Sequence, residues 1–174
     1  MTLLFLCNES EVIIMATAGL STIGVLVGYA TESTAGTRPT AGFTKLSRIN
    51  AVGGISLDVE QIDASALEDS VTKYIAGRAD TGSDFSITVN YTNETATEWS
   101  TLFTAAQTAK NTNKATWIEI YHPSLTNAFF VSVELPSKLP VPEMGQNELL
   151  TVEIGCTVVD FETGTAVAPT GATS

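Results

Sequence analysis

The clearest alternation of apolar and polar positions in the chain covers residues 83–91. Phe85, Ile87, Val89 and Tyr91 alternate there with polar residues. A two-residue period is typical of a β-strand that buries one face. We therefore predict a strand in this segment.

An amphipathic helix is predicted directly after this strand. Its apolar positions follow the helical spacing i, i+3, i+4, i+7 and are Trp99, Leu102, Phe103 and Ala106. Such a stripe packs a helix onto a sheet. Thr95 and Glu98 have the spacing of a capping box at the start of a helix, and residues 111–113 are predicted to end it.

Three more strands are predicted after the helix, over residues 115–122, 127–135 and 148–161. Each alternates apolar with polar positions, and the last one places Cys156 on its apolar face. Two prolines exclude residues 138–142 from a central strand. The uncharged tail of residues 163–174 is expected to be mobile.

Upstream of residue 63, two β-prone runs flank the pair Gly53-Gly54. Residues 44–52 and 55–62 are therefore predicted to form a hairpin. In the second run the apolar face, with Ile55, Leu57 and Val59, is expected to point into the core.

Residues 63–84 are predicted to form a long loop that joins this hairpin to the strand of residues 83–91. Loops of this length are uncommon inside a compact domain and are usually functional or disordered. This one carries apolar residues and charges of both signs, so we predict that it contacts a neighbouring copy of the chain. The candidate contact residues are Glu68, Asp69, Lys73, Tyr74, Arg78 and Asp80. The alternative is a solvated loop with a short helical turn.

The N-terminal region allows more than one interpretation. Residues 12–31 carry no charge, which is long enough for a membrane span, but three glycines dilute the run and no Lys or Arg precedes Arg38. We therefore expect residues 16–42 to be an extended arm. Met15, followed by small residues, is a second possible start of translation.

Together these elements predict a mainly β (α+β) fold. We expect an antiparallel β-sandwich or half-barrel with one flanking α-helix, a long inserted loop, and extended termini. The predicted division is an N-terminal extension and arm over 1–42, a β domain over 43–161 and a C-terminal tail over 162–174.

Charge and composition exclude several functions. The net charge of −11 is spread along the chain, which argues against binding nucleic acid through its phosphates. One histidine and two distant cysteines cannot form a Cys/His metal cluster, and Cys156 is expected to be a buried free thiol. No phosphate-binding loop, dinucleotide fingerprint or nucleophile elbow occurs. We expect no enzyme activity, cofactor or metal.

The order of these segments resembles the major tail protein of long-tailed, non-contractile bacteriophages, the subunit of the tail tube. The resemblance spans residues 28–161 and is carried by GYATESTAGTRPT, LSRINAVGGISLDVEQIDAS, LEDSVTKYIAGRADTG with FSITVNY, EWSTLFTAAQ and LLTVEIGCTVVDFETG. The inner tubes of contractile tails and of type VI secretion systems look similar in fold.

The resemblance implies a structural virion protein whose hexameric rings stack into a hollow tube. The loop of residues 63–84 would reach a neighbouring subunit or ring, and the two termini would pack outside or between rings. Partners would be other copies, the tape-measure protein and tail-end proteins, with assembly in the host cytoplasm and no membrane. Genomic DNA would pass without specific binding.

A conduit for DNA is expected to repel DNA, so acids suit its lumen. The candidate lumen-facing acids are Asp84, Glu119, Glu134 and Glu153. The alternative function is an exported or membrane-tethered β-sandwich binding module, anchored through residues 12–30.

Overall fold

The computed structural model describes residues 19–80 and 85–171. Cys7, the possible start at Met15 and the candidate acid Asp84 lie outside the described residues. The elements are β1 (Leu26–Thr31), β2 (Thr44–Leu46), β3 (Ile49–Val52), β4 (Asp58–Asp63), β5 (Tyr74–Asp80), β6 (Phe85–Asn90), α1 (Asn93–Lys110), β7 (Thr116–Tyr121), β8 (Asn127–Glu134) and β9 (Thr151–Thr165).

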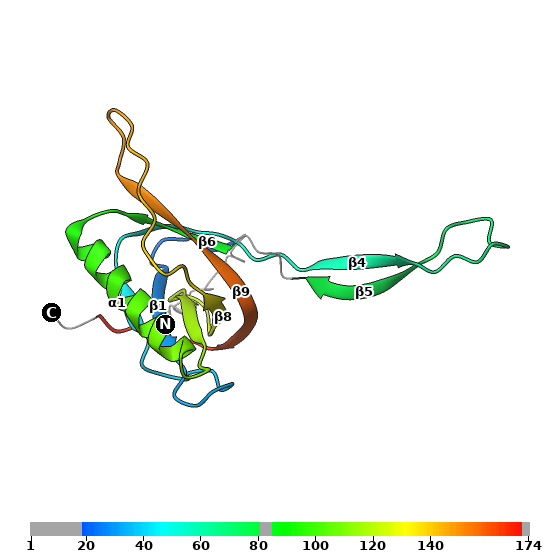
Figure 1. Cartoon of the computed structure of the whole chain (residues 1–174), viewed down its shortest axis with the longest axis horizontal. Coiled ribbons are helices and arrows are strands. Elements are labelled where there is room, and N and C mark those ends of the chain that lie inside the picture. The colour runs from blue at the N-terminus through cyan, green and yellow to red at the C-terminus, as the bar shows by residue number, and fades with distance from the viewer. Residues whose placement is uncertain (1–18, 81–84, 172–174) are drawn as a thin grey trace, which may run out of the picture.

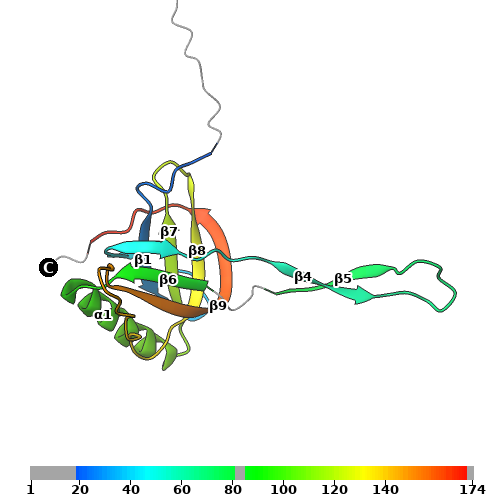
Figure 2. The same ribbon diagram turned by 90° about the horizontal axis from the view of Figure 1, so that it is seen from above.

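Seven strands form one antiparallel sheet in the order β2-β1-β7-β8-β9-β6-β3. Figure 1 shows β9 beside β6 and β8. The long strand β9 joins its two parts, because residues 151–156 pair with β6 and residues 157–165 pair with β8. Val159 is the extra residue of a bulge, since Val158 and Asp160 face consecutive residues of β8. A bulge bends a strand and increases its twist, and β9 curves visibly in Figure 2.

The two edge strands of the sheet, β2 and β3, are consecutive in the chain, because the sheet curls and brings its edges close together. Only Ser47 and Arg48 separate β2 from β3, and Arg48 has a positive φ of 54°. Glu98 of α1 holds this corner by accepting hydrogen bonds from the Ser47 amide at 2.9 Å and hydroxyl at 2.8 Å. The predicted half-barrel with one flanking helix is confirmed as a mainly β fold.

Helix α1 covers the inner face of the curved sheet. Its N-cap is Thr92, whose side chain exchanges hydrogen bonds with Thr95 in a capping box. The predicted pairing of Thr95 with Glu98 was therefore wrong by one turn, because Glu98 is engaged by Ser47. Trp99, Leu102 and Phe103 are buried as predicted.

The main core lies between α1 and the sheet. Its buried members come from both parts of the sheet and are Val27, Leu46, Phe85, Ile87, Val89, Trp99, Leu102, Phe103, Ile118, Val131, Val133, Val152, Ile154, Cys156 and Val158. Cys156 is a free thiol, as predicted, and burial raises its pKa to about 12.

The exposed face of α1 is rich in threonine. The hydroxyls of Thr97, Thr101, Thr104 and Thr108 each donate to the carbonyl four residues earlier, at 2.8 to 3.0 Å. The side chains are exposed, and each hydroxyl is already bonded to the helix backbone.

A second, smaller core lies on the outer face of β1, β7 and β8. It consists of Ala30, Phe43, Trp117, Ala128 and Phe130. The segment of residues 32–43 and the end of the chain cover it.

Glu32 is buried in this second core and accepts hydrogen bonds from the Gly36 and Ala115 amides and the Trp117 indole at 2.8 to 3.1 Å. Burial opposes ionisation, but these hydrogen bonds hold the pKa of Glu32 below its ordinary value.

The predicted extended N-terminal arm is wrong for its described part. Residues 26–31 form β1, which pairs with β7 over its full length and buries Val27. The predicted loose tail is also wrong up to residue 171. Strand β9 continues to Thr165, and Thr170 pairs with residues 43–45 through the Lys45 amide at 2.8 Å and the Phe43 carbonyl at 3.0 Å.

The predicted hairpin around Gly53-Gly54 does not form. Strand β3 pairs with β6, and Gly53 donates to the Ser86 carbonyl at 2.7 Å. The second predicted arm becomes β4, which pairs with β5 instead. Of its supposed core face, Ile55 packs against the core, whereas Leu57 and Val59 are 54% and 51% exposed.

Trp99 is expected to contribute most to the packing of the helix on the sheet, because it is a fully buried tryptophan. Trp99→Ala should lower the free energy of unfolding by about 3–5 kcal/mol, measured by urea denaturation. The control is Ser100→Ala, an exposed position on the same helix, which should change it by less than about 0.5 kcal/mol. Equal effects of the two variants would contradict this packing.

Candidate functional site

The segment predicted as a loop over residues 63–84 is largely an antiparallel hairpin. Strands β4 and β5 pair from Asp58↔Asp80 to Asp63↔Tyr74. The hairpin projects from the globular part of the chain (Figures 1 and 2). The connection through residues 81–84 lies outside the described residues.

A bulge near the middle of the hairpin changes its register. Val59 faces Ala79, but Gln61 faces Ala76, so Gly77 and Arg78 lie opposite Glu60 alone. A Cβ on Gly77 would lie 3.0 Å from the Glu60 carbonyl oxygen and 3.2 Å from the Ile62 side chain. Glycine at this position therefore allows the close approach of the two strands.

The tip of the hairpin has a defined hydrogen-bonded structure. The Ala64 amide donates to the Lys73 carbonyl at 2.8 Å, and the Lys73 amide donates to the Ser65 hydroxyl at 2.9 Å. Asp63 accepts from the Ser65 amide, and Asp69 accepts from the Ala66 amide and the Lys73 ammonium.

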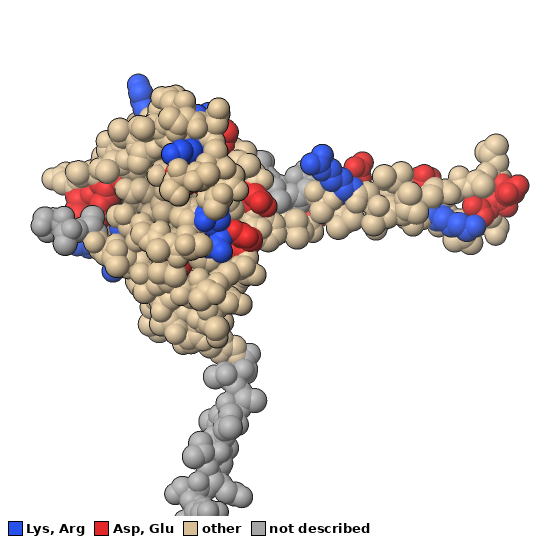
Figure 3. Space-filling model, turned by 90° about the horizontal axis from the view of Figure 1, so that it is seen from below, with Lys and Arg blue, Asp and Glu red and all other residues tan. Residues whose placement is uncertain are grey.

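The two tip carboxylates are stabilised in their ionised form. Hydrogen bonds from Ser65 lower the pKa of Asp63, and Lys73 together with the Ala66 amide lowers the pKa of Asp69. Charges of both signs therefore persist on the hairpin at neutral pH. Figure 3 shows them side by side near its end.

Apolar side chains are exposed along the whole projection. They are Leu57, Val59, Ile62, Leu67, Val71, Tyr74 and Ile75, and the least exposed of them, Ile62, is 47% accessible. Ile62 and Ile75 face each other across the strands. An isolated two-stranded hairpin is marginally stable in water, and a run of uncovered apolar side chains is typical of an interaction surface.

All of the predicted contact residues belong to this hairpin. Glu68, Asp69 and Lys73 are at its tip, and Tyr74 and Arg78 are on β5. Asp80 ends β5, and only its backbone pairing with Asp58 is described. That they contact another copy stays a prediction. Sequence reasoning missed the β4 side chains, because their alternation was interpreted as a core face.

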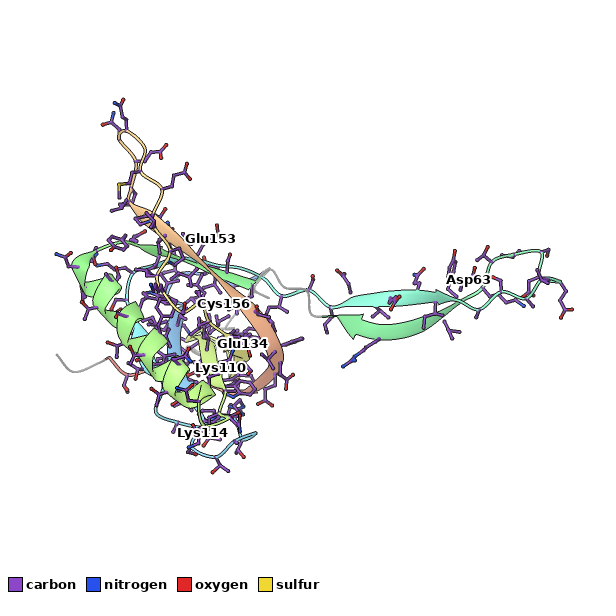
Figure 4. The ribbon with its side chains drawn as sticks, in the orientation of Figure 1. Asp63, Lys110, Lys114, Glu134, Glu153 and Cys156 are labelled. Carbon is purple, nitrogen blue, oxygen red and sulfur yellow. The ribbon has the colours of Figure 1, made fainter. Side chains whose placement is uncertain are left out.

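The candidate lumen-facing acids are not a single group. Glu134 is exposed and paired with Lys110 at 3.0 Å (Figure 4), and Glu153 is exposed on β9. Glu119 is fully buried, because its side chain points into the second core, where the Val167 amide donates to it at 3.1 Å. The prediction that Glu119 faces a lumen is therefore wrong for this subunit.

No catalytic arrangement is evident within residues 19–80 and 85–171. No group of three or more His, Cys, Asp or Glu in these ranges could hold a metal ion. His122 has a local structural role: its Nδ1 accepts from the Ser124 amide at 3.1 Å, which leaves Nε2 to donate to the Ser21 carbonyl at 2.7 Å. None of the helices described here is both long and apolar enough to cross a membrane.

The hairpin isoleucines should contribute little to the stability of the isolated subunit, because they are about half exposed. Ile62→Ser combined with Ile75→Ser should lower the unfolding free energy of the monomer by less than about 1 kcal/mol. Ile87→Ser, at a fully buried position in β6, should cost more than about 3 kcal/mol. Urea denaturation at a concentration where the protein is monomeric measures both, and a large loss in the hairpin variant would show that the subunit itself needs these side chains.

Comparisons with known proteins give a likeness of structure alone. No family model matches the chain, and no curated protein matches it in sequence. A chain in the cryo-EM structure of the anti-feeding prophage baseplate, six-fold symmetrised, is similar with a TM-score of 0.50 and 14% identity, over 87% of this chain and 98% of that one. A chain in the tail of an empty GTA particle with C6 symmetry has a TM-score of 0.49 and 11% identity, over 82% of this chain and 96% of that one. The first likeness shows that the fold is shared with a chain of the anti-feeding prophage baseplate.

Proposed function

We propose that this chain is a structural virion protein, the subunit of a bacteriophage tail tube. Copies assemble into hexameric rings, and the rings stack into a tube around the tape-measure protein. The tube conducts the genome without binding it specifically. In this proposal the protein acts without catalysis or a cofactor, is assembled in the host cytoplasm, and resides in the tail of the virion.

The observation that carries this proposal is the projecting β4–β5 hairpin. Its apolar side chains are exposed in the single subunit, and an ordered tip places charges of both signs at its end. Such a surface costs free energy in water unless another surface covers it. Apolar burial would supply affinity, while the charges would set the register between copies.

The fold supports the same interpretation. It is shared with a chain of a baseplate that was treated as six-fold symmetric. The sheet is curled but its edge strands β2 and β3 do not pair with each other. Thr170 covers part of the β2 edge, and addition of strands from neighbouring copies would satisfy the edge groups that remain free.

The charge of the subunit is compatible with a conduit for DNA. Nineteen acidic residues oppose eight basic ones, and of the four candidate lumen acids, Glu134 and Glu153 are exposed. We retain these two, together with Asp84, as candidates for the lumen wall, where they would repel DNA.

Electron microscopy of the purified protein tests the proposal. Negative staining of the wild-type chain should show rings or tubes, and the Ile62→Ser/Ile75→Ser variant should be monomeric or form far fewer of them. The matched control is Val141→Ser/Met144→Ser, which removes two exposed apolar side chains between β8 and β9 and should assemble normally.

Three results would count against different parts of the proposal. Wild-type protein that stays monomeric at all concentrations would argue against a tube subunit. Normal tubes from the hairpin variant would leave the subunit role intact but remove the hairpin from the contact. Recovery of the protein only with membranes would favour the alternative, a tethered binding module.

A further inference from the structure

The last described residues, 166–171, form a strap across the outer face of the sheet. The Ala166 amide donates to the Thr126 carbonyl, the Val167 amide to Glu119, and Thr170 pairs with residues 43–45. Pro169 is buried against β1. A Cβ added to Gly28 would lie 2.7 Å from the Pro169 ring, so the absence of a side chain there admits the strap.

Glu119 is enclosed beneath this strap. Its side chain is fully buried, with one oxygen accepting from Val167 at 3.1 Å. The other oxygen, Oε2, is buried and has no hydrogen-bond partner among the described residues. A buried carboxylate with an unpaired oxygen is costly when ionised, whereas a protonated carboxyl carries no net charge.

The cation that acts on Glu119, Arg38, is engaged elsewhere. Arg38 forms an ion pair with Glu162 of β9, and its guanidinium lies 4.1 Å from the centre of the Phe130 ring. Arg38 attracts the Glu119 charge without hydrogen-bonding to it. The other neighbours of Glu119 across the strands, Gly28 and Phe130, are uncharged.

We propose that the strap is a proton-linked latch: it docks when Glu119 is protonated and is released when Glu119 ionises. Release lets water reach the carboxylate, and the same movement frees the edge of β2 that Thr170 covers. A free edge can accept a strand from another chain. The latch is a property of the single subunit and does not depend on the tail-tube function.

The direction of the pH dependence follows from the balance at Glu119. Burial raises the pKa of Glu119, and the Val167 amide and Arg38 only partly oppose this. Docking is therefore strongest at a pH below the ordinary pKa of a carboxyl group. It weakens as the pH rises through the raised pKa of Glu119.

Amide hydrogen exchange measures the latch directly. Protection factors of the Val167 and Thr170 amides should be lower at about pH 8 than at about pH 4. The expected fall is about tenfold for each unit by which docking raises the pKa of Glu119. Protection of Ile118 and Val131 amides in the central sheet should not follow. In Glu119→Gln, which is neutral at every pH, strap protection should be constant.

Two further variants separate the latch from a general loss of structure. Glu134→Gln, an exposed carboxyl on β8, should keep the wild-type pH dependence. Gly28→Ala should displace Pro169 and lower strap protection at every pH.

Strap protection that is constant with pH in the wild type, or that still falls with pH in Glu119→Gln, would overturn the proposal. If Glu119→Gln does not fold, the wild type decides: the NMR titration midpoint of the Glu119 carboxyl must coincide with the strap transition, and a separate midpoint overturns the latch.

Discussion

Continuous pairing of β9 with two different strands holds this subunit together. Its first half pairs with β6 and its second half with β8, so one strand connects both parts of the sheet. The bulge at Val159 lets it bend between them. The curvature of β9 creates the concave face that α1 fills, and it brings β2 and β3 close enough for two residues to connect them. The packing of the helix and the corner at Ser47 both depend on this bend.

The subunit divides its apolar residues between two uses. Those facing α1 are buried within one chain, whereas those of the β4–β5 hairpin are exposed at the surface. The hairpin keeps its shape through backbone pairing and the hydrogen bonds at its tip rather than through burial. A surface that is ordered before binding loses less conformational entropy when it is covered.

Sequence patterns predicted the elements that bury one face and failed where burial was decided by distant partners. The alternation in β6 and β9 and the helical stripe at Trp99 reflect a one-sided environment, so they could be interpreted locally. Leu57 and Val59 alternate in the same way, but β4 has no core beside it. The pair Gly53-Gly54 favours a turn, yet Gly53 bonds to β6 instead. Glu119 alternates with apolar neighbours as a surface residue would, and it is buried because residues 32–43 and 166–171 return over this face of the sheet. The contacts of the hairpin and the tube itself remain predictions, because they involve other chains.

The threonine-rich face of α1 is less polar than its composition indicates. Each of four exposed hydroxyls donates its hydrogen bond to a carbonyl of its own helix. What remains for a neighbouring molecule is a set of methyl groups and acceptor oxygens, with few free donors and no fixed charge. Hydropathy scales count threonine as mildly polar because its hydroxyl normally bonds to water. On this helix the water has been replaced, so the face can approach another surface with little loss of hydration and without selecting a partner by charge.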